Sequence, residues 1–341
     1  MVAAALIFSN AAAFADDVNR IPVINGTLRA KYEYQPQINA GRFEVRTARV
    51  SVTGLIVRDL SYKAEIDLCD EGKIKMLDAF IRYSPLTWQF TIGQIRVPFT
   101  IDAPRSPHLQ YFANRSFIAK QAANVRDVGL CASYTFKGAF PATLTAGIFN
   151  SSGLTNQKDF WTKSYNFSFK ALLPLFGERL VISPSVQRAR PGDVYVMLWD
   201  VGAYWDDKLW HVEAEYLRKI YDKNQFPDVN VVDVFVSRLF HIKHTISGIS
   251  ALARYDFMGD HSTGVYDENK KLIVNDPRRH RLTVGATMHI GVWKFYGQLR
   301  LNYEKYFYGK DAEPAISERD KIVAEIMVRF ESLAACRDIV P

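Results

Sequence analysis

The chain lacks the features that mark several common protein classes. Its 3 cysteines in 341 residues are too few for a disulfide framework and too scattered for a zinc site. No stretch approaches the roughly 18 consecutive apolar residues of a membrane-spanning helix. Glycine (19) and proline (14) are too sparse for a collagen-like or low-complexity sequence. Basic residues outnumber acidic ones by 43 to 36, but the longest basic cluster is PRRHR at residues 277–281. Nucleic-acid-binding proteins usually concentrate such charge, so we expect no nucleic-acid partner.

The first 15 residues carry no charge and lead into Asp16 and Asp17. The sequence Ala13-Phe14-Ala15 matches the small-residue pattern of a signal-peptidase cleavage site. We therefore expect residues 1–15 to be a signal peptide, which implies export. An apolar N-terminal helix stays open as an alternative, because the usual positively charged start is missing.

Apolar and polar residues alternate along most of the chain. Between Trp210 and Tyr216, for example, apolar residues alternate with His211, Glu213 and Glu215. A period of two indicates a β-strand with one apolar and one polar face. Such segments have about the length of a tilted membrane-spanning strand, roughly ten residues. Sixteen of them are predicted, at residues 26–36, 42–57, 60–69, 74–84, 87–97, 126–136, 142–150, 162–173, 178–189, 195–206, 208–219, 230–240, 245–257, 278–290, 292–307 and 317–330.

The links between these segments are alternately short and long. The odd-numbered links, counted from the N-terminus, are often the longer ones, and 98–125 is the third link on this long side. The longer links include residues 98–125, 151–161, 220–229, 258–277 and 308–316. Short turns on one side and long loops on the other are typical of outer-membrane barrels. We therefore predict an all-β fold, a 16-stranded antiparallel transmembrane β-barrel over residues 16–330, with short periplasmic turns. Residues 331–341 would follow as a periplasmic tail.

A soluble β-sandwich or β-helix is the alternative to a membrane barrel, because it also shows a period of two. The single run of strands, the alternating link lengths and the aromatic residues near strand ends favour the barrel. Tyr62, Tyr134 and Trp210 are examples of such aromatics, which form the interfacial girdles of membrane barrels.

Five short segments in the first part of the chain have a recognisable pattern. They are FEVRTAR at 43–49, DA at 78–79, GQIRVPF at 93–99, NRS at 114–116 and RDVG at 126–129. This pattern resembles the phosphate-selective porin O and P family of outer-membrane porins, over about residues 26–136. The resemblance implies a trimeric, sixteen-stranded porin whose third long loop folds into the lumen. It also implies a pore lined by basic residues, which passes phosphate or polyphosphate in the best-known members.

The longest link, residues 98–125, is the expected constriction of the pore. A sixteen-stranded barrel encloses a wide aqueous lumen, and long loops in compact folds are usually functional. In and beside this link we predict an anion-binding constriction, because guanidinium groups match oxyanions and a lysine supplies a point charge. His108 would add positive charge at low pH. An alternative role for the arginines is to hold the loop against the wall by pairing with lumen carboxylates. The candidate residues are Arg96, Arg105, Arg115, Lys120 and Arg126.

Together these observations predict a passive, anion-preferring porin in the outer membrane of a Gram-negative bacterium. We expect a homotrimer, with small anionic solutes and with outer-membrane lipid and lipopolysaccharide as partners, and no cofactor, metal or catalytic site. The basic cluster at 278–281 would lie at the outer rim, facing lipopolysaccharide phosphates or solvent. Two alternatives stay open: a barrel enzyme of the phospholipase or protease kind, which needs clustered Ser/His or Asp/His residues, and a structural or adhesin barrel.

Overall fold

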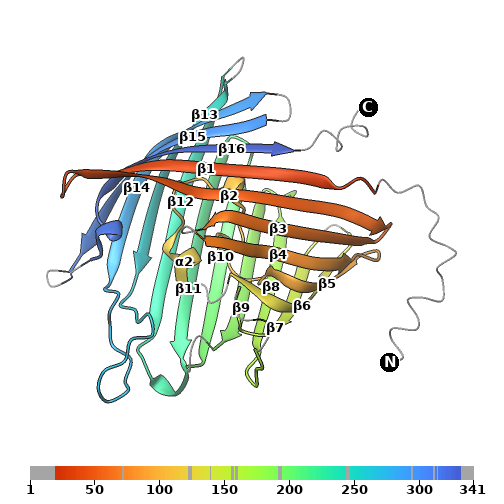
Figure 1. Ribbon diagram of the computed structural model, residues 1–341, viewed down its shortest axis with the longest axis horizontal. Helices are drawn as coiled ribbons and strands as arrows, with labels where there is room; N and C mark the ends of the chain where they lie inside the picture. Colours follow the sequence, from red (N-terminus) through yellow and green to blue (C-terminus); the bar gives the residue numbers. More distant parts are fainter. Residues whose placement is uncertain are drawn as a thin grey trace.

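The computed structural model is a closed barrel of sixteen antiparallel strands (Figure 1). It describes residues 20–331 except 71–72, 122–124, 139, 155–156, 158–159, 191–193, 243–245, 293–294, 310–311 and 313. The strands are β1 (Val23–Gln35), β2 (Ala40–Val57), β3 (Leu60–Asp70), β4 (Lys73–Tyr83), β5 (Trp88–Arg96), β6 (Arg126–Thr135), β7 (Thr143–Phe149), β8 (Asn166–Leu175), β9 (Leu180–Ala189), β10 (Val196–Asp206), β11 (Trp210–Tyr221), β12 (Val229–His241), β13 (Ile246–Met258), β14 (Arg279–Val292), β15 (Phe295–Tyr308) and β16 (Lys321–Glu331). All sixteen predicted strands and the predicted fold class are confirmed.

Each strand pairs with its neighbours in sequence, and β1 pairs with β16 to close the ring. The start of β1 and the end of β16 lie at the same end, because Asn25 is opposite Glu331. The predicted signal peptide, residues 1–15, and residues 332–341 of the predicted tail lie outside the described residues. In the described part of the chain, no helix is long and apolar enough to cross a membrane.

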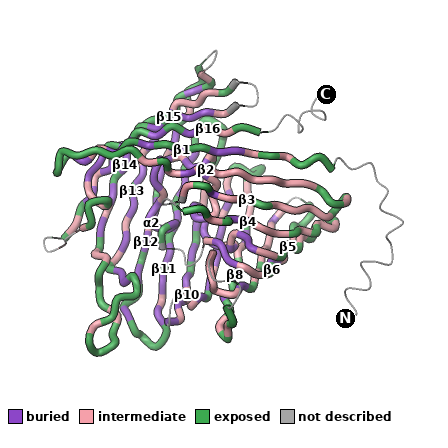
Figure 2. Tube along the Cα trace, viewed as in Figure 1, coloured by how far each residue is buried: buried purple, intermediate pink, exposed green. Residues whose placement is uncertain are grey.

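Burial is inverted relative to a water-soluble β-protein. Along β11, Trp210, Val212 and Tyr216 are exposed, whereas the alternating Glu213 and Glu215 are almost completely buried. The same alternation runs along β12, β13 and β16, and Figure 2 colours buried residues of β12 and β13 purple. The outer wall is therefore apolar and the inner wall polar, as a bilayer outside and an aqueous lumen inside require.

The link between β5 and β6 folds inside the barrel, as predicted for the third long loop. It contains the 3-10 helix η2 (Pro107–Leu109) and the short helix α2 (Phe117–Gln121), which lies within the ring of strands (Figure 1). Phe117 and Ile118 of α2 are completely buried, and α2 contacts β11, β12 and β13. The remaining 3-10 helices, η3 (Asp222–Asn224) and η4 (Ile316–Glu318), lie in other long links. The main hydrophobic core is thus built partly from this lumen loop.

Gly93 fixes the geometry of β5 just before the loop. Its φ is +130°, and a Cβ at this position would collide with the carbonyl oxygen of Ala79 on β4. The next residue, Gln94, donates hydrogen bonds from Nε2 to the carbonyl oxygens of Met76 (2.6 Å) and Leu77 (2.8 Å). The GQIRVPF segment therefore locks β5 against β4 where the chain turns into the lumen.

We predict that Gly93→Ala destabilises the barrel by at least about 2 kcal/mol, because backbone strain adds to the collision. The measurement is the temperature at which the purified protein loses its heat-modifiable migration in a gel. Gly138→Ala is the matched control, since Gly138 has the same φ of +130° but nothing within 4 Å of the added Cβ. Equal losses in the two variants would show that the contact with β4 has no effect.

Candidate functional site

The lumen loop is organised around Asp102. This carboxylate accepts hydrogen bonds from the backbone N–H and the hydroxyl of Ser116 (3.1 and 2.8 Å) and pairs with Arg105 at 3.2 Å. Burial by itself would raise the pKa of Asp102, but the charges of Arg105 and Arg115 outweigh it and hold that pKa below its usual range. The carboxylate therefore stays ionised and joins the two halves of the loop.

Arg105 ties the loop to the wall. Its Nη2 lies 2.5 Å from Oε2 of the completely buried Glu213 on β11. Its guanidinium also stacks over the ring of Tyr111, with Cζ 5.3 Å from the centroid. Burial alone would lower the pKa of Arg105, but Glu213 and Asp102 raise it above its usual value. This arginine is permanently charged and fully engaged in holding the loop.

Arg115 is engaged with backbone carbonyl groups of the loop. It donates to the carbonyl oxygens of Asp102 (2.6 Å), Ala103 (3.2 Å) and Arg105 (2.7 Å). Burial, above all, lowers its pKa to about 10, so it is charged at neutral pH. Its hydrogen bonds brace the loop internally.

The other three predicted residues lie in two different places. Arg96 and Arg126 are opposite each other on β5 and β6. Arg126 pairs with Asp78 at 2.6 Å, while Arg96 donates to Ser106 Oγ at 3.1 Å and to the carbonyl of Pro104. Lys120 pairs with Glu318 of η4 at 2.6 Å. The structure therefore does not gather the five residues into one site, and most of their contacts serve to anchor the loop.

Buried carboxylates of β10–β13 form the wall against which the loop packs. Besides Glu213 and Arg105, Glu215 accepts the N–H of Ile101, and Asp256 accepts the N–H of Phe117 at 3.1 Å. We name this surface the acidic wall, and its members are Asp200, Glu213, Glu215, Asp233 and Asp256. Because the loop covers them, each of these residues is at most 5% exposed.

The opposite side of the lumen is lined by accessible cations, and we name it the basic wall. Its members on β2–β5 are Arg46, Arg49, Lys63, Arg82 and Arg96. The side chains of Arg46, Arg49, Lys63 and Arg96 are 18 to 38% exposed. The carboxylates among them, Glu65, Asp67 and Asp78, are only 1 to 9% exposed.

Glu44 is an exception on this side, since 27% of its side chain is exposed. Arg42 and Arg46 both pair with it, at 3.2 and 3.3 Å. The surface that a solute meets near β2–β5 is therefore predominantly positive.

Sequence reasoning missed the basic wall, apart from Arg96. Inward-facing charges summed around the whole barrel are balanced and show no preferred sign. Summed strand by strand, the inward-facing charges are net positive on β2–β5 and net negative on β10–β13. Summing the inward-facing charges over each group of neighbouring strands could therefore have found the basic wall.

The basic cluster at 278–281 does not lie on the outer rim as expected. Arg279 and Arg281 are buried in the lumen, where Arg281 pairs with Asp256 at 2.9 Å and Arg279 with Glu318 at 2.9 Å. Arg278 is exposed. The expectation failed because neighbouring residues on a strand point to opposite faces.

The described histidines do not form a catalytic arrangement. Ser250 Oγ lies 2.8 Å from Nε2 of His289, but Nδ1 of that ring faces the hydroxyl of Tyr296 at 3.2 Å. His211 lies between Asp206 and Glu213. Across the ranges that the structure describes, no serine, histidine and carboxylate form one hydrogen-bonded chain. The same ranges contain no cluster of three His, Cys, Asp or Glu side chains that could hold a metal ion.

A model of the phosphate-selective porin O and P family matches residues 26–171. The match confirms the resemblance seen in the sequence, which already covered the lumen loop, and extends it through β7 into β8. The chain is an outer-membrane porin. Its location is the outer membrane of a Gram-negative bacterium, and the match to this family together with the fold indicates a channel rather than an enzyme. Among curated proteins, none matches the sequence of this porin.

Solved structures similar to the porin share its fold at low sequence identity. A loop-deletion mutant of the outer-membrane protein OmpT of Vibrio cholerae is 11% identical, with a TM-score of 0.61 over 92% of this chain and 99% of that one. The anion-selective porin from Comamonas acidovorans is 10% identical, with a TM-score of 0.60 over 92% and 100%. The outer-membrane channel DcaP of Acinetobacter baumannii is 13% identical, with a TM-score of 0.55 over 91% and 97%.

His108 gives the lumen a predictable response to pH. Burial, followed by the charges of Arg329 and Arg96, lowers the pKa of His108 to about 4. In the folded protein this ring is therefore neutral above about pH 4, whereas in the unfolded chain it takes up a proton near pH 6.5. Stability should consequently fall as the pH drops from about 6.5 to about 4.

We predict that His108→Gln, which cannot titrate, loses less stability than the wild type between pH 7 and pH 4.5. The measurement is the apparent unfolding temperature in detergent at the two pH values. Equal losses in the two proteins would contradict the lowered pKa. Ion selectivity should not change through His108 in this range, because its charge does not change.

Proposed function

We propose that this porin passes small hydrophilic solutes by passive diffusion with a preference for anions, phosphate-type oxyanions among them. The observation that carries the proposal is the unequal exposure of the two signs of charge. The acidic wall is covered by the loop, and the carboxylates Glu65, Asp67 and Asp78 lie beneath their cation partners. The cations of the basic wall keep part of their surface open to the lumen.

Among the five residues predicted from sequence, this proposal gives different roles to different members. Arg96 belongs to the basic wall and would meet the solute, with Arg126 beside it. Arg105 and Arg115 would act by positioning the loop, and Lys120 by fastening α2 to η4. Several separated cations that each bind weakly allow an anion to enter and also to leave.

Conductance measurements on single channels test this preference. In a KCl gradient, the reversal potential of the wild type should show chloride favoured over potassium. A unit charge near the ion path shifts ion energies by about 1–4 kcal/mol, depending on the effective dielectric constant. Screening limits its reach to about 8 Å at 0.15 M salt, so the preference should strengthen at low salt. Arg46→Gln combined with Arg96→Gln should move the reversal potential toward zero.

Arg238→Gln is the control for this experiment, because Arg238 is an exposed residue on the outer wall that stacks over Trp210 and Phe240. It removes the same kind of charge without touching the lumen and should leave selectivity unchanged. A wild type that prefers potassium would contradict the proposal. Added inorganic phosphate should reduce the chloride current of the wild type more than that of the double variant.

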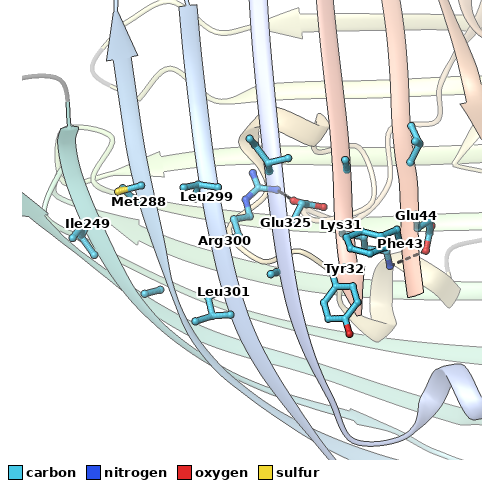
Figure 3. A pocket seen from close by; sticks show the side chains of 15 residues that line it. Lys31, Tyr32, Phe43, Glu44, Ile249, Met288, Leu299, Arg300, Leu301 and Glu325 are labelled. Carbon is cyan, nitrogen blue, oxygen red and sulfur yellow. Dashed lines mark hydrogen bonds and ion pairs between the residues drawn. The ribbon is translucent and has the colours of Figure 1, made fainter. Parts of the chain in front are cut away.

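We also propose that the porin is a homotrimer. An apolar hollow of about 690 Å³ lies on the outer wall across β1–β2 and β13–β16 (Figure 3). Its floor includes Ala30, Ala286 and Ala324, and Tyr32 and Phe43 lie beside it. Small residues beside large ones on a lipid-facing wall allow close packing of another protein surface. A solved form of OmpT from Vibrio cholerae, with a TM-score of 0.55 and 11% identity, is a trimer.

Filling this hollow should weaken assembly. We predict that Ala324→Trp reduces the fraction of chemically crosslinked trimer in mild detergent, while Ala203→Trp, on the outer wall of β10, does not. Both variants should keep heat-modifiable migration, which reports a folded barrel. Crosslinking that yields only monomer in the wild type would overturn the trimer, and an unaffected Ala324→Trp would exclude this hollow from the interface.

A further inference from the structure

Two arginines and a tyrosine form a cluster at the long-loop end of β9 and β10. The Cζ atoms of Arg188 and Arg190 lie 5.1 and 5.2 Å from the ring centroid of Tyr195. Arg190 Nη1 donates to Ser164 Oγ at 3.0 Å, and this hydroxyl is 2.6 Å from the hydroxyl of Tyr195. We name these four residues the Arg188 patch.

Arg188 points outward from the barrel. Its neighbours along β9, Gln187 and Ala189, are buried on the inner face. Across the sheet it is opposite Phe167 on β8 and Met197 on β10, and Phe167 is exposed on the outer wall. Because β9 begins at the short turn after β8 and ends at Ala189, Arg188 lies near the extracellular end.

The position of Arg188 suits the membrane–water interface. An arginine on the lipid face costs roughly 2–4 kcal/mol at the bilayer midplane but only about 0–1 near the interface. The exposed Phe167 is its cross-strand neighbour on β8, and Tyr165 and Trp161, also exposed, precede Phe167 in the chain. The patch therefore lies at the depth of the outer-leaflet headgroups.

The guanidinium of Arg188 is exposed on the outer wall. No carboxylate of the described residues forms an ion pair with Arg188. A further cation, Lys163, lies exposed next to Ser164 in the chain. A cationic, aromatic surface at this depth is complementary to an anionic headgroup of the surrounding leaflet.

We propose that the Arg188 patch binds a phosphate group of an anionic glycolipid of the outer leaflet, of the lipid A type. The planar donors of guanidinium match phosphate oxygens two at a time. Stacking on Tyr195 and the bond to Ser164 hold both arginines in place before the lipid arrives, which lowers the entropic cost of binding. This site is on the outer wall, so it is independent of the solute that the pore passes.

Lipid retention on the full-length, folded porin tests the site. The purified protein is incubated with bis-phosphorylated lipid A in detergent, and the bound lipid is counted by native mass spectrometry. We expect Arg188→Gln with Arg190→Gln to retain about tenfold less lipid, which corresponds to about 1.4 kcal/mol. Arg188→Lys should retain an intermediate amount, because it keeps the charge but loses the planar donors.

Arg238→Gln is the matched control. The Cζ of Arg238 lies 4.9 and 4.8 Å from the ring centroids of Trp210 and Phe240, at the opposite, short-turn end of the wall. This variant should retain lipid A like the wild type. Equal retention by the double variant, or an equal loss in Arg238→Gln, would overturn the proposal. Heat-modifiable migration checks that each variant is folded, and the single exposed variant Arg188→Gln replaces the pair if Arg190→Gln does not fold.

Two further arms identify the ligand chemistry. Dephosphorylated lipid A should not be retained, and excess inorganic phosphate should not displace bound lipid A. Retention of the dephosphorylated lipid would show that acyl chains, and not phosphate, bind. Displacement by inorganic phosphate would assign the patch to free phosphate and overturn the lipid proposal. Single-channel conductance should be unchanged in all variants, which separates this site from the proposed anion pathway.

Discussion

The structure depends on one constraint. The interior of a lipid bilayer offers no hydrogen-bond partners, so the backbone N–H and C=O groups of every strand must find partners within the protein. Inside a bilayer an open sheet edge would leave a row of unpaired N–H and C=O groups, so the sheet has to close. The pairing of β1 with β16 removes that edge. Closure forces one face of every strand outward into lipid and the other inward. The inverted burial along β11, with Trp210 outside and Glu213 inside, follows from it.

Closure also creates a lumen that something has to fill, and the filling decides which charges solutes meet. The loop between β5 and β6 carries Arg105, which pairs with Glu213, and backbone N–H groups that bond to Glu215 and Asp256. Because the loop itself buries these carboxylates, its contacts supply the partners without which their burial would carry a high energetic cost. As a result, the acidic wall is hidden and the basic wall is left open. Fastening the loop and the proposed anion preference are thus two effects of one set of ion pairs.

The outer wall has its own division of roles. Its middle is apolar, with a hollow of small residues on β1 and β14–β16 that suits another subunit. At the extracellular end, Arg188 and Tyr195 present charge and aromatic surface where headgroups begin. At the short-turn end, Arg238 stacks between Trp210 and Phe240 in a similar way. Both ends follow from the rule that cations on a lipid-facing wall are tolerated only near the interface.

Strand positions, the closed sixteen-stranded fold and the place of the lumen loop were predictable from the sequence, because alternation and link length are local properties. Residues 43–49 and 93–99 also pointed to the porin family. The partners of the charged residues were not predictable. Arg105 and Glu213 are 108 positions apart, and Asn114 bonds to Glu304 across 190 positions. Such pairs depend on which strands face each other across the lumen and on the path of the loop through it.

The inward position of Arg279 and Arg281 follows from strand alternation, but their pairing with Glu318 and with the buried Asp256 does not. By itself, the sequence determined which residues alternate and therefore the barrel. Only the tertiary structure decided which charges neutralise one another and which remain accessible, because ion pairing depends on distances of a few ångströms between strands far apart in the chain.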